Sequence, residues 1–165
     1  MRDKLISVIE HLIKYNHKII IILDKVTVTG FKEIKEKYPE RVLKIETNTS
    51  AGTLFLINMA AGMMLSGMYP FVYTSGCFLT ENVFEQIKAI SGYQTERAGI
   101  VLISKRMTPD DLPFNIRFLQ SSADVTLLNT LDNWKLIVPE NRKEMDMALH
   151  EIATNTGFYY VRLPA

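Results

Sequence analysis

Apolar residues follow two kinds of spacing along the chain, and the alternation between them predicts its elements. In residues 3–15 they recur every three or four positions, which predicts an amphipathic helix. Residues 18–24 hold an unbroken isoleucine and leucine run that ends in a carboxylate, which is typical of a buried strand in a parallel sheet. The same patterns predict helices at 31–38, 50–65, 80–91, 119–131 and 139–153, and strands at 41–46, 70–74, 99–104, 134–138 and 158–163.

Alternating strands and helices predict one α/β domain over residues 1–165, a three-layer sandwich around a mainly parallel six-stranded sheet. A length of 165 residues is typical of one domain. In such sheets ligands bind beyond the carboxyl ends of the strands. We therefore expect a site in the loops that follow Asp24, Glu46, Thr74 and Ser104.

Residues 47–80 contain no Asp, Glu, Lys or Arg, although both flanking segments are densely charged. The apolar part, 54–73, is long enough to cross a membrane, which takes about 20 residues. Asn58, Gly62 and Pro70 interrupt it, however, and the Ser-Gly-Met-Tyr-Pro string predicts a turn. We therefore predict a helix and a strand that are buried on most sides, and no membrane span. A helix that is apolar all round also suits a subunit interface.

Composition narrows the choice of partners. Nineteen basic and 18 acidic residues give a net charge of +1, which provides no argument for a nucleic-acid partner. The single cysteine, Cys77, excludes a disulfide framework, and the three histidines are not spaced as metal ligands. The charged, amphipathic N-terminus does not resemble a signal peptide, so we expect a cytoplasmic protein.

The sequence holds neither of the standard glycine-rich phosphate-binding motifs and no G-x-S-x-G string. Glu46 is the carboxylate with the most unusual setting, because it follows a predicted strand and directly precedes the charge-free stretch. Two alternatives are open for it. It is either a buried carboxyl group with a raised pKa or an exposed carboxylate at the end of a strand.

Several strings, in this order and spacing, resemble the pyrimidine-binding domain of the transketolase family. That family includes deoxyxylulose-phosphate synthase and the two-chain transketolases, and it uses thiamine diphosphate. The resemblance covers nearly the whole chain. The matching strings are Met-Arg-Asp-Lys at 1–4, the Ala-Ala-Gly helix at 58–67 with Pro-Phe-Val at 70–72, Phe-Leu-Thr-Glu-Asn-Val-Phe-Glu-Gln-Ile at 78–87, Leu-Ile-Val-Pro at 136–139 and Tyr-Val-Arg-Leu-Pro at 160–164.

The resemblance implies a cofactor shared between two domains. In the family, the pyrimidine-binding domain supplies a glutamate to a ring nitrogen and an aromatic residue that stacks on the ring, and another domain supplies Gly-Asp-Gly and a metal. This chain has no Gly-Asp-Gly, so the resemblance implies a diphosphate-binding partner chain that holds magnesium, in a homodimer or heterotetramer. It makes Phe78 the stacking candidate and Gln86 a cofactor-site candidate, whereas Phe84 is expected in the core.

The chain also departs from the family pattern. The family glutamate lies about nine residues before the glycine of Ala-Ala-Gly, where this chain has Thr53, and counting from the preceding strand leads to Thr49. Glu46 is the nearby carboxylate, so we take it as the candidate catalytic substitute. The histidine of the family's Gly-x-Thr-His string is missing as well, although Asp124 follows that place. Family members continue into a further domain after the last strand.

Two functions follow from these matches and departures. In the first, the chain is the pyrimidine-binding subunit of a two- or three-chain thiamine diphosphate enzyme that acts on a ketose or 2-oxo acid. In the second, it is a degenerate, non-catalytic domain that serves assembly or small-ligand binding. An unrelated flavodoxin-like binding domain is a third alternative, because fold alone does not fix function.

Overall fold

The computed structural model describes residues 2–25, 27–46, 50–75, 79, 83–93, 99–105 and 123–164. Six strands form one sheet in the order β2-β1-β3-β4-β6-β5, and every neighbouring pair is parallel. The α/β fold around a parallel six-stranded sheet is therefore confirmed. The strands are β1 (Ile19–Leu23), β2 (Val42–Lys44), β3 (Tyr69–Ser75), β4 (Ile100–Lys105), β5 (Trp134–Ile137) and β6 (Phe158–Leu163).

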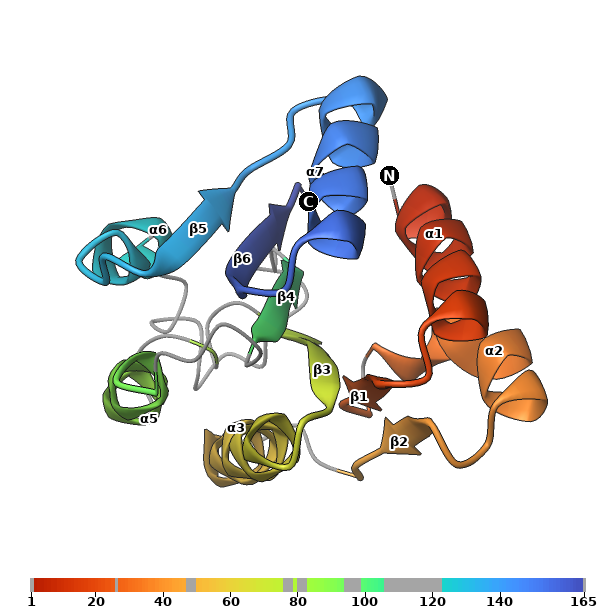
Figure 1. Ribbon diagram of the computed structural model, residues 1–165, viewed down its shortest axis with the longest axis horizontal. Coiled ribbons are helices and arrows are strands. Elements are labelled where there is room, and N and C mark those ends of the chain that lie inside the picture. Colours follow the sequence, from red (N-terminus) through yellow and green to blue (C-terminus); the bar gives the residue numbers. More distant parts are fainter. Residues whose placement is uncertain are drawn as a thin grey trace, which may run out of the picture.

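Helices cover both faces of this sheet (Figure 1). One face carries α1, α2 and α7, and the other carries α3, α5 and α6. The helices are α1 (Arg2–Tyr15), α2 (Lys32–Lys37), α3 (Ser50–Leu65), α5 (Phe84–Ser91), α6 (Ala123–Leu128) and α7 (Arg142–Thr154), with a 3-10 turn, η1 (Val28–Phe31), before α2.

The continuous isoleucine run of β1 is explained by these two helical layers. Ile21 belongs to the core beneath α1 and α7, whereas its neighbour Ile22 belongs to the core beneath α3 and α5. Successive side chains of a strand point to opposite faces, so a strand buried on both faces needs an apolar residue at every position.

The described part of the charge-free stretch forms a helix, a turn and a strand, as predicted. Helix α3 ends in a Schellman turn, in which the N–H of Met68 donates to Met63 O and the N–H of Gly67 donates to Met64 O. Gly67 has a φ of 85°, a conformation that glycine adopts without steric cost. Among the described residues, no helix is long and apolar enough to cross a membrane.

The last two helices differ slightly from the prediction. Helix α7 begins at Arg142, because the Asn141 side chain accepts from the N–H of Glu144 and caps the helix. Helix α6 ends at Leu128 and not at the predicted residue 131. Turn-type bonds replace the helical ones there, since the N–H of Thr130 donates to Leu127 O.

Candidate functional site

The carboxyl ends of all six strands lie at one edge of the sheet, because the strands are all parallel. The strand order changes direction at β1, which has β2 on one side and β3 on the other. In parallel α/β sheets, ligands bind outside the carboxyl ends at such a switch point. This edge is therefore the candidate site.

A hydrogen-bonded cluster closes the edge between β1 and β3. The Asp24 carboxylate is buried, and its Oδ1 accepts from both the N–H and the hydroxyl of Thr27, each at 2.7 Å. Its Oδ2 accepts from the Thr74 hydroxyl at 2.5 Å. The Thr27 hydroxyl also lies 2.8 Å from the carbonyl oxygen of Tyr73. Because both carboxylate oxygens have partners, the cluster holds the β1–η1 connection against β3 and is structural.

A second buried cluster lies at the edge between β4 and β6. The Tyr160 hydroxyl donates to Asp124 Oδ2 at 2.7 Å, and Arg162 Nε lies 3.2 Å from the same oxygen. Burial raises the pKa of the Tyr160 phenol, which therefore stays protonated and acts as the donor. Among the described residues, the buried Asp124 Oδ1 has no hydrogen-bond partner. The cluster thus joins β6 to the start of α6 through the other carboxylate oxygen.

Glu46 follows β2 at the same edge, and its side chain is 63% exposed. It forms an ion pair with Lys44, and a hydrogen bond from that lysine lowers the pKa of the Glu46 carboxyl group. Of the two alternatives for Glu46, the structure thus shows the exposed strand-end carboxylate. A buried carboxyl group with a raised pKa was the wrong alternative.

The other candidate cofactor residues are placed only in part. Thr53 lies in the first turn of α3 and is 2% exposed, and Gln86 is half-buried on α5. Phe84 packs against the core beneath α3 and α5, as expected. Thr49 and Phe78 lie outside the described residues, as does Cys77.

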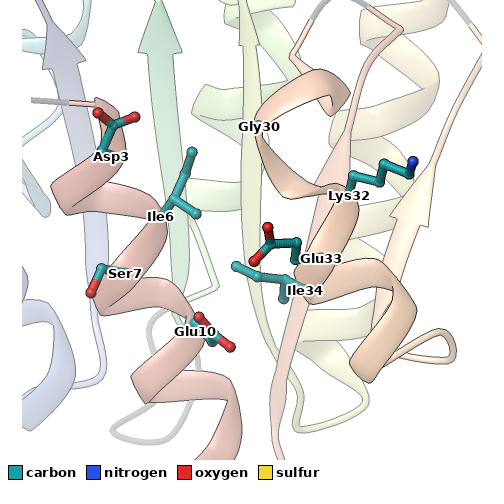
Figure 2. Close-up of a pocket in the computed structure, with 8 residues that line it drawn as sticks. All are labelled: Asp3, Ile6, Ser7, Glu10, Gly30, Lys32, Glu33 and Ile34. Atoms are coloured by element: carbon teal, nitrogen blue, oxygen red, sulfur yellow. The ribbon is translucent and has the colours of Figure 1, made fainter.

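An open groove of about 710 Å³ lies between α1 and the η1–α2 segment (Figure 2). Figure 2 shows Ile6 and Ile34 projecting from opposite walls, with acidic side chains around them. Its lining residues are Asp3, Ile6, Ser7, Glu10, Gly30, Lys32, Glu33 and Ile34.

Among the described residues, no group of three or more His, Cys, Asp or Glu side chains could hold a metal ion.

Sequence reasoning found Asp24 and Thr74 as strand ends, but it missed their common hydrogen-bonded cluster. It also missed the contact of Tyr160 and Arg162 with Asp124. The sequence feature that could have indicated these contacts is the presence of polar residues inside otherwise apolar strands, as in Tyr-Val-Arg-Leu at the end of β6. Such residues need buried partners, but the pattern does not show which partner each one has.

Known proteins give three findings. No family model matches the sequence. The chain is 28% identical over 144 residues to an uncharacterised 33.6 kDa protein of the fasciation locus of Rhodococcoides fascians, and 27% identical over 138 residues to the 1-deoxy-D-xylulose-5-phosphate synthase of Fusobacterium nucleatum. Among solved structures, it resembles a split-gene transketolase, an inactive β4 tetramer, with a TM-score of 0.73 and 20% identity over 98% of this chain.

The chain spans less than half of each of these proteins. It covers 44% of the Rhodococcoides protein, 21% of the synthase and 49% of the split-gene transketolase chain. The protein is therefore an α/β domain whose fold resembles about half of a split-gene transketolase chain. The predicted resemblance to the pyrimidine-binding domain of the transketolase family is confirmed.

Proposed function

We propose that this chain is the pyrimidine-binding subunit of a thiamine diphosphate-dependent, transketolase-like enzyme, a transferase that acts on a ketose or 2-oxo acid substrate. The observation that supports this most is the match of 98% of the chain to part of a split-gene transketolase chain. The similarity to a deoxyxylulose-phosphate synthase supports the same family from the sequence.

The subunit works in the cytoplasm with a separate chain that binds the diphosphate and its magnesium. Two observations support a partner. The sequence has no Gly-Asp-Gly string, and no acidic or histidine cluster among the described residues could hold the metal. We therefore propose that a diphosphate-binding partner chain completes the cofactor site, in a homodimer or heterotetramer.

Among the described candidate residues, a polar side chain is available near the expected place of the cofactor ring, but the carboxyl group is poorly suited to exchange a proton with that ring. Thr53 places a buried polar side chain in the first turn of α3, at the position where the family pattern has its glutamate. A carboxyl group that shares a proton with the ring needs a pKa near the working pH. Glu46 is exposed and its pKa is lowered, so it does not fit that role while it is paired with Lys44.

This misfit supports a second candidate function. A domain of this fold without a suitable acid could bind the cofactor, or only its partner chain, and contribute no chemistry of its own. For Glu46 to act as the catalytic substitute, its ion pair with Lys44 must break and the carboxyl group must move into the cofactor site. The two candidate functions therefore predict the same assembly with a partner chain, but only the first predicts that the complex converts substrate.

Co-expression with a diphosphate-binding chain from a neighbouring gene, followed by calorimetric titration with thiamine diphosphate and magnesium, tests both candidates. We expect saturable binding that Phe78→Ala weakens and Tyr93→Ala, a change at an exposed aromatic residue, does not. Absence of binding to the wild-type complex would exclude the proposed cofactor.

Turnover of a ketose donor or a 2-oxo acid then separates the candidates. An active complex that Glu46→Ala inactivates, while Glu36→Ala does not, supports the enzyme and the role of Glu46. Full activity in Glu46→Ala would leave the enzyme in place and remove Glu46 from its chemistry. A complex that binds the cofactor without turnover would favour the non-catalytic domain.

A further inference from the structure

The open groove between α1 and the η1–α2 segment has an apolar middle. Its volume of about 710 Å³ lies in the range of sites that bind ligands. Ile6 reaches the groove from α1 and Ile34 reaches it from α2, and Figure 2 shows both side chains between the two walls. Ile34 is buried, whereas Ile6 is only partly buried. An apolar side chain of another molecule would therefore shield Ile6 further from water.

Acidic side chains surround this apolar middle. On α1, Asp3 lies one turn before Ile6 and Glu10 lies one turn after it, and residues at this spacing share one side of a helix. Glu33, in the first turn of α2, adds a third carboxylate from the opposite wall. The groove thus combines an apolar middle with an acidic rim.

Two of the three carboxylates are not neutralised by an ion pair. Lys37 pairs with Glu10 at 2.5 Å and acts on Glu33 from beyond ion-pair distance. Among the described residues, neither Asp3 nor Glu33 forms an ion pair. Lys32, the cation of the groove lining, points away from α1 in Figure 2. The groove therefore attracts positive charge.

A second hollow, on the side of α1 that faces α7, differs in its charge. It has a volume of about 470 Å³, and its lining residues are Asp3, Lys4, Ser7, Arg142 and Asp146. Lys4 pairs with Asp146 at 3.1 Å, and the lining has as many cations as carboxylates. A basic partner would gain no net attraction there, so we expect it on the α2 side of α1.

We propose that the groove between α1 and the η1–α2 segment binds a basic amphipathic helix of a partner protein. An apolar side chain of that helix lies against Ile6, and its lysine or arginine side chains lie near Asp3 and Glu33. An amphipathic helix is expected because it can repeat the spacing of Asp3, Ile6 and Glu10 along α1. Charge complementarity favours a basic helix over an acidic one. This goes beyond the proposed function, since it requires neither the cofactor nor turnover.

Fluorescence anisotropy of the full chain with a labelled peptide tests the proposal. The peptide consists of two Lys-Ala-Ala-Ala-Leu-Ala-Ala repeats and a final lysine, so that its lysines and leucines share one side of a helix. We expect saturable binding that weakens as salt is added, because salt screens exposed charges. Peptides with glutamate in place of lysine, or with serine in place of leucine, should not saturate. No saturable binding of the first peptide, or equal binding of either control peptide, would overturn the proposal.

Variants of the chain then locate the bound peptide. The double variant Asp3→Asn, Glu33→Gln should bind it about 2–30-fold more weakly, as expected for the loss of two exposed ion pairs. Glu36→Gln is the matched control, because Glu36 is an exposed carboxylate of α2 outside the groove lining, and it should bind as the wild type does. Circular dichroism checks the fold of both variants. Unchanged binding by the double variant, or an equal loss in Glu36→Gln, would overturn the proposal.

Discussion

Helices α1 and α3 cover opposite faces of the same sheet, and they differ in what they turn outward. Both bury an apolar inner side, with Leu5 in one core and Leu56 in the other, and neither leucine is exposed. On its outer side, α1 carries ion pairs, such as Lys4 with Asp146 of α7 at 3.1 Å. Helix α3 carries none, since it has no charged residue. The inner sides thus hold both helices to the sheet, and the outer sides differ in charge.

The largest expected effect tests whether the inner sides are equivalent. Leu5→Ala and Leu56→Ala each remove a fully buried leucine, so each should lower the free energy of unfolding by about 2–5 kcal/mol. Urea denaturation of the two variants measures the loss. A loss below about 1 kcal/mol for Leu56→Ala would mean that α3 is not held by its own sheet, and the comparison of the two helices would then fail.

The next effect concerns the carboxyl edge of the sheet between β1 and β3, where Asp24 lies. After Asp24→Ala the Thr27 hydroxyl keeps the Tyr73 carbonyl as an acceptor, but the Thr74 hydroxyl loses its carboxylate partner, and a buried unsatisfied group costs about 1–3 kcal/mol. We expect a loss in that range, measured by urea denaturation. Asp132→Ala, at an exposed position, is the control and should change stability by less than about 0.5 kcal/mol. Equal losses in both variants would show that the Asp24 cluster does not hold the edge.

The sequence predicted elements better than it predicted contacts between them. The bounds of α3 and β6 were predicted to the residue, because local signals mark their ends, such as the Ser-Gly-Met turn after Leu65. The bond between Asp24 and Thr74 joins residues 50 positions apart, so it depends on the register of β1 against β3. The spacing of residues along one strand does not reveal which residues of the neighbouring strand lie beside them.

The outcome for Glu46 has a different lesson. Lys44 lies two positions earlier, and residues two apart in a strand lie on the same face. The ion pair that lowers the Glu46 pKa was therefore within reach of sequence reasoning. The exposure of Glu46 could not be predicted in this way, because it depends on β2 being an edge strand of the sheet, where fewer neighbours cover a side chain.

A smaller effect tests the outward side of α3 at Gly62. Gly62→Ala should raise the free energy of unfolding by about 0.4–1 kcal/mol, because alanine restricts the unfolded chain and its Cβ meets no neighbour. Ala61→Gly, at the neighbouring position, should lower it by about 0.5–1 kcal/mol. Thermal unfolding of the two variants measures both changes. If Gly62→Ala destabilised the protein, a close contact at Gly62 would be indicated.

The smallest effect lies at the boundary of the charge-free stretch, where Glu46 is the last charged residue before α3. The pKa of Glu46 is lowered from 4.5 in the folded chain, so its ion pair stabilises the protein above about pH 4.5 and is lost as the pH falls through the folded value. Glu46→Gln should therefore lower the melting temperature slightly at pH 7 and leave it unchanged near pH 3. Glu36→Gln, an exposed carboxylate of α2, should show no such pH-dependent difference. A Glu46→Gln variant that melted at a higher temperature than the wild type at pH 7, with the difference vanishing near pH 3, would instead mean that the folded chain favours the protonated carboxyl group, which is the state that a proton-sharing residue of a thiamine enzyme needs.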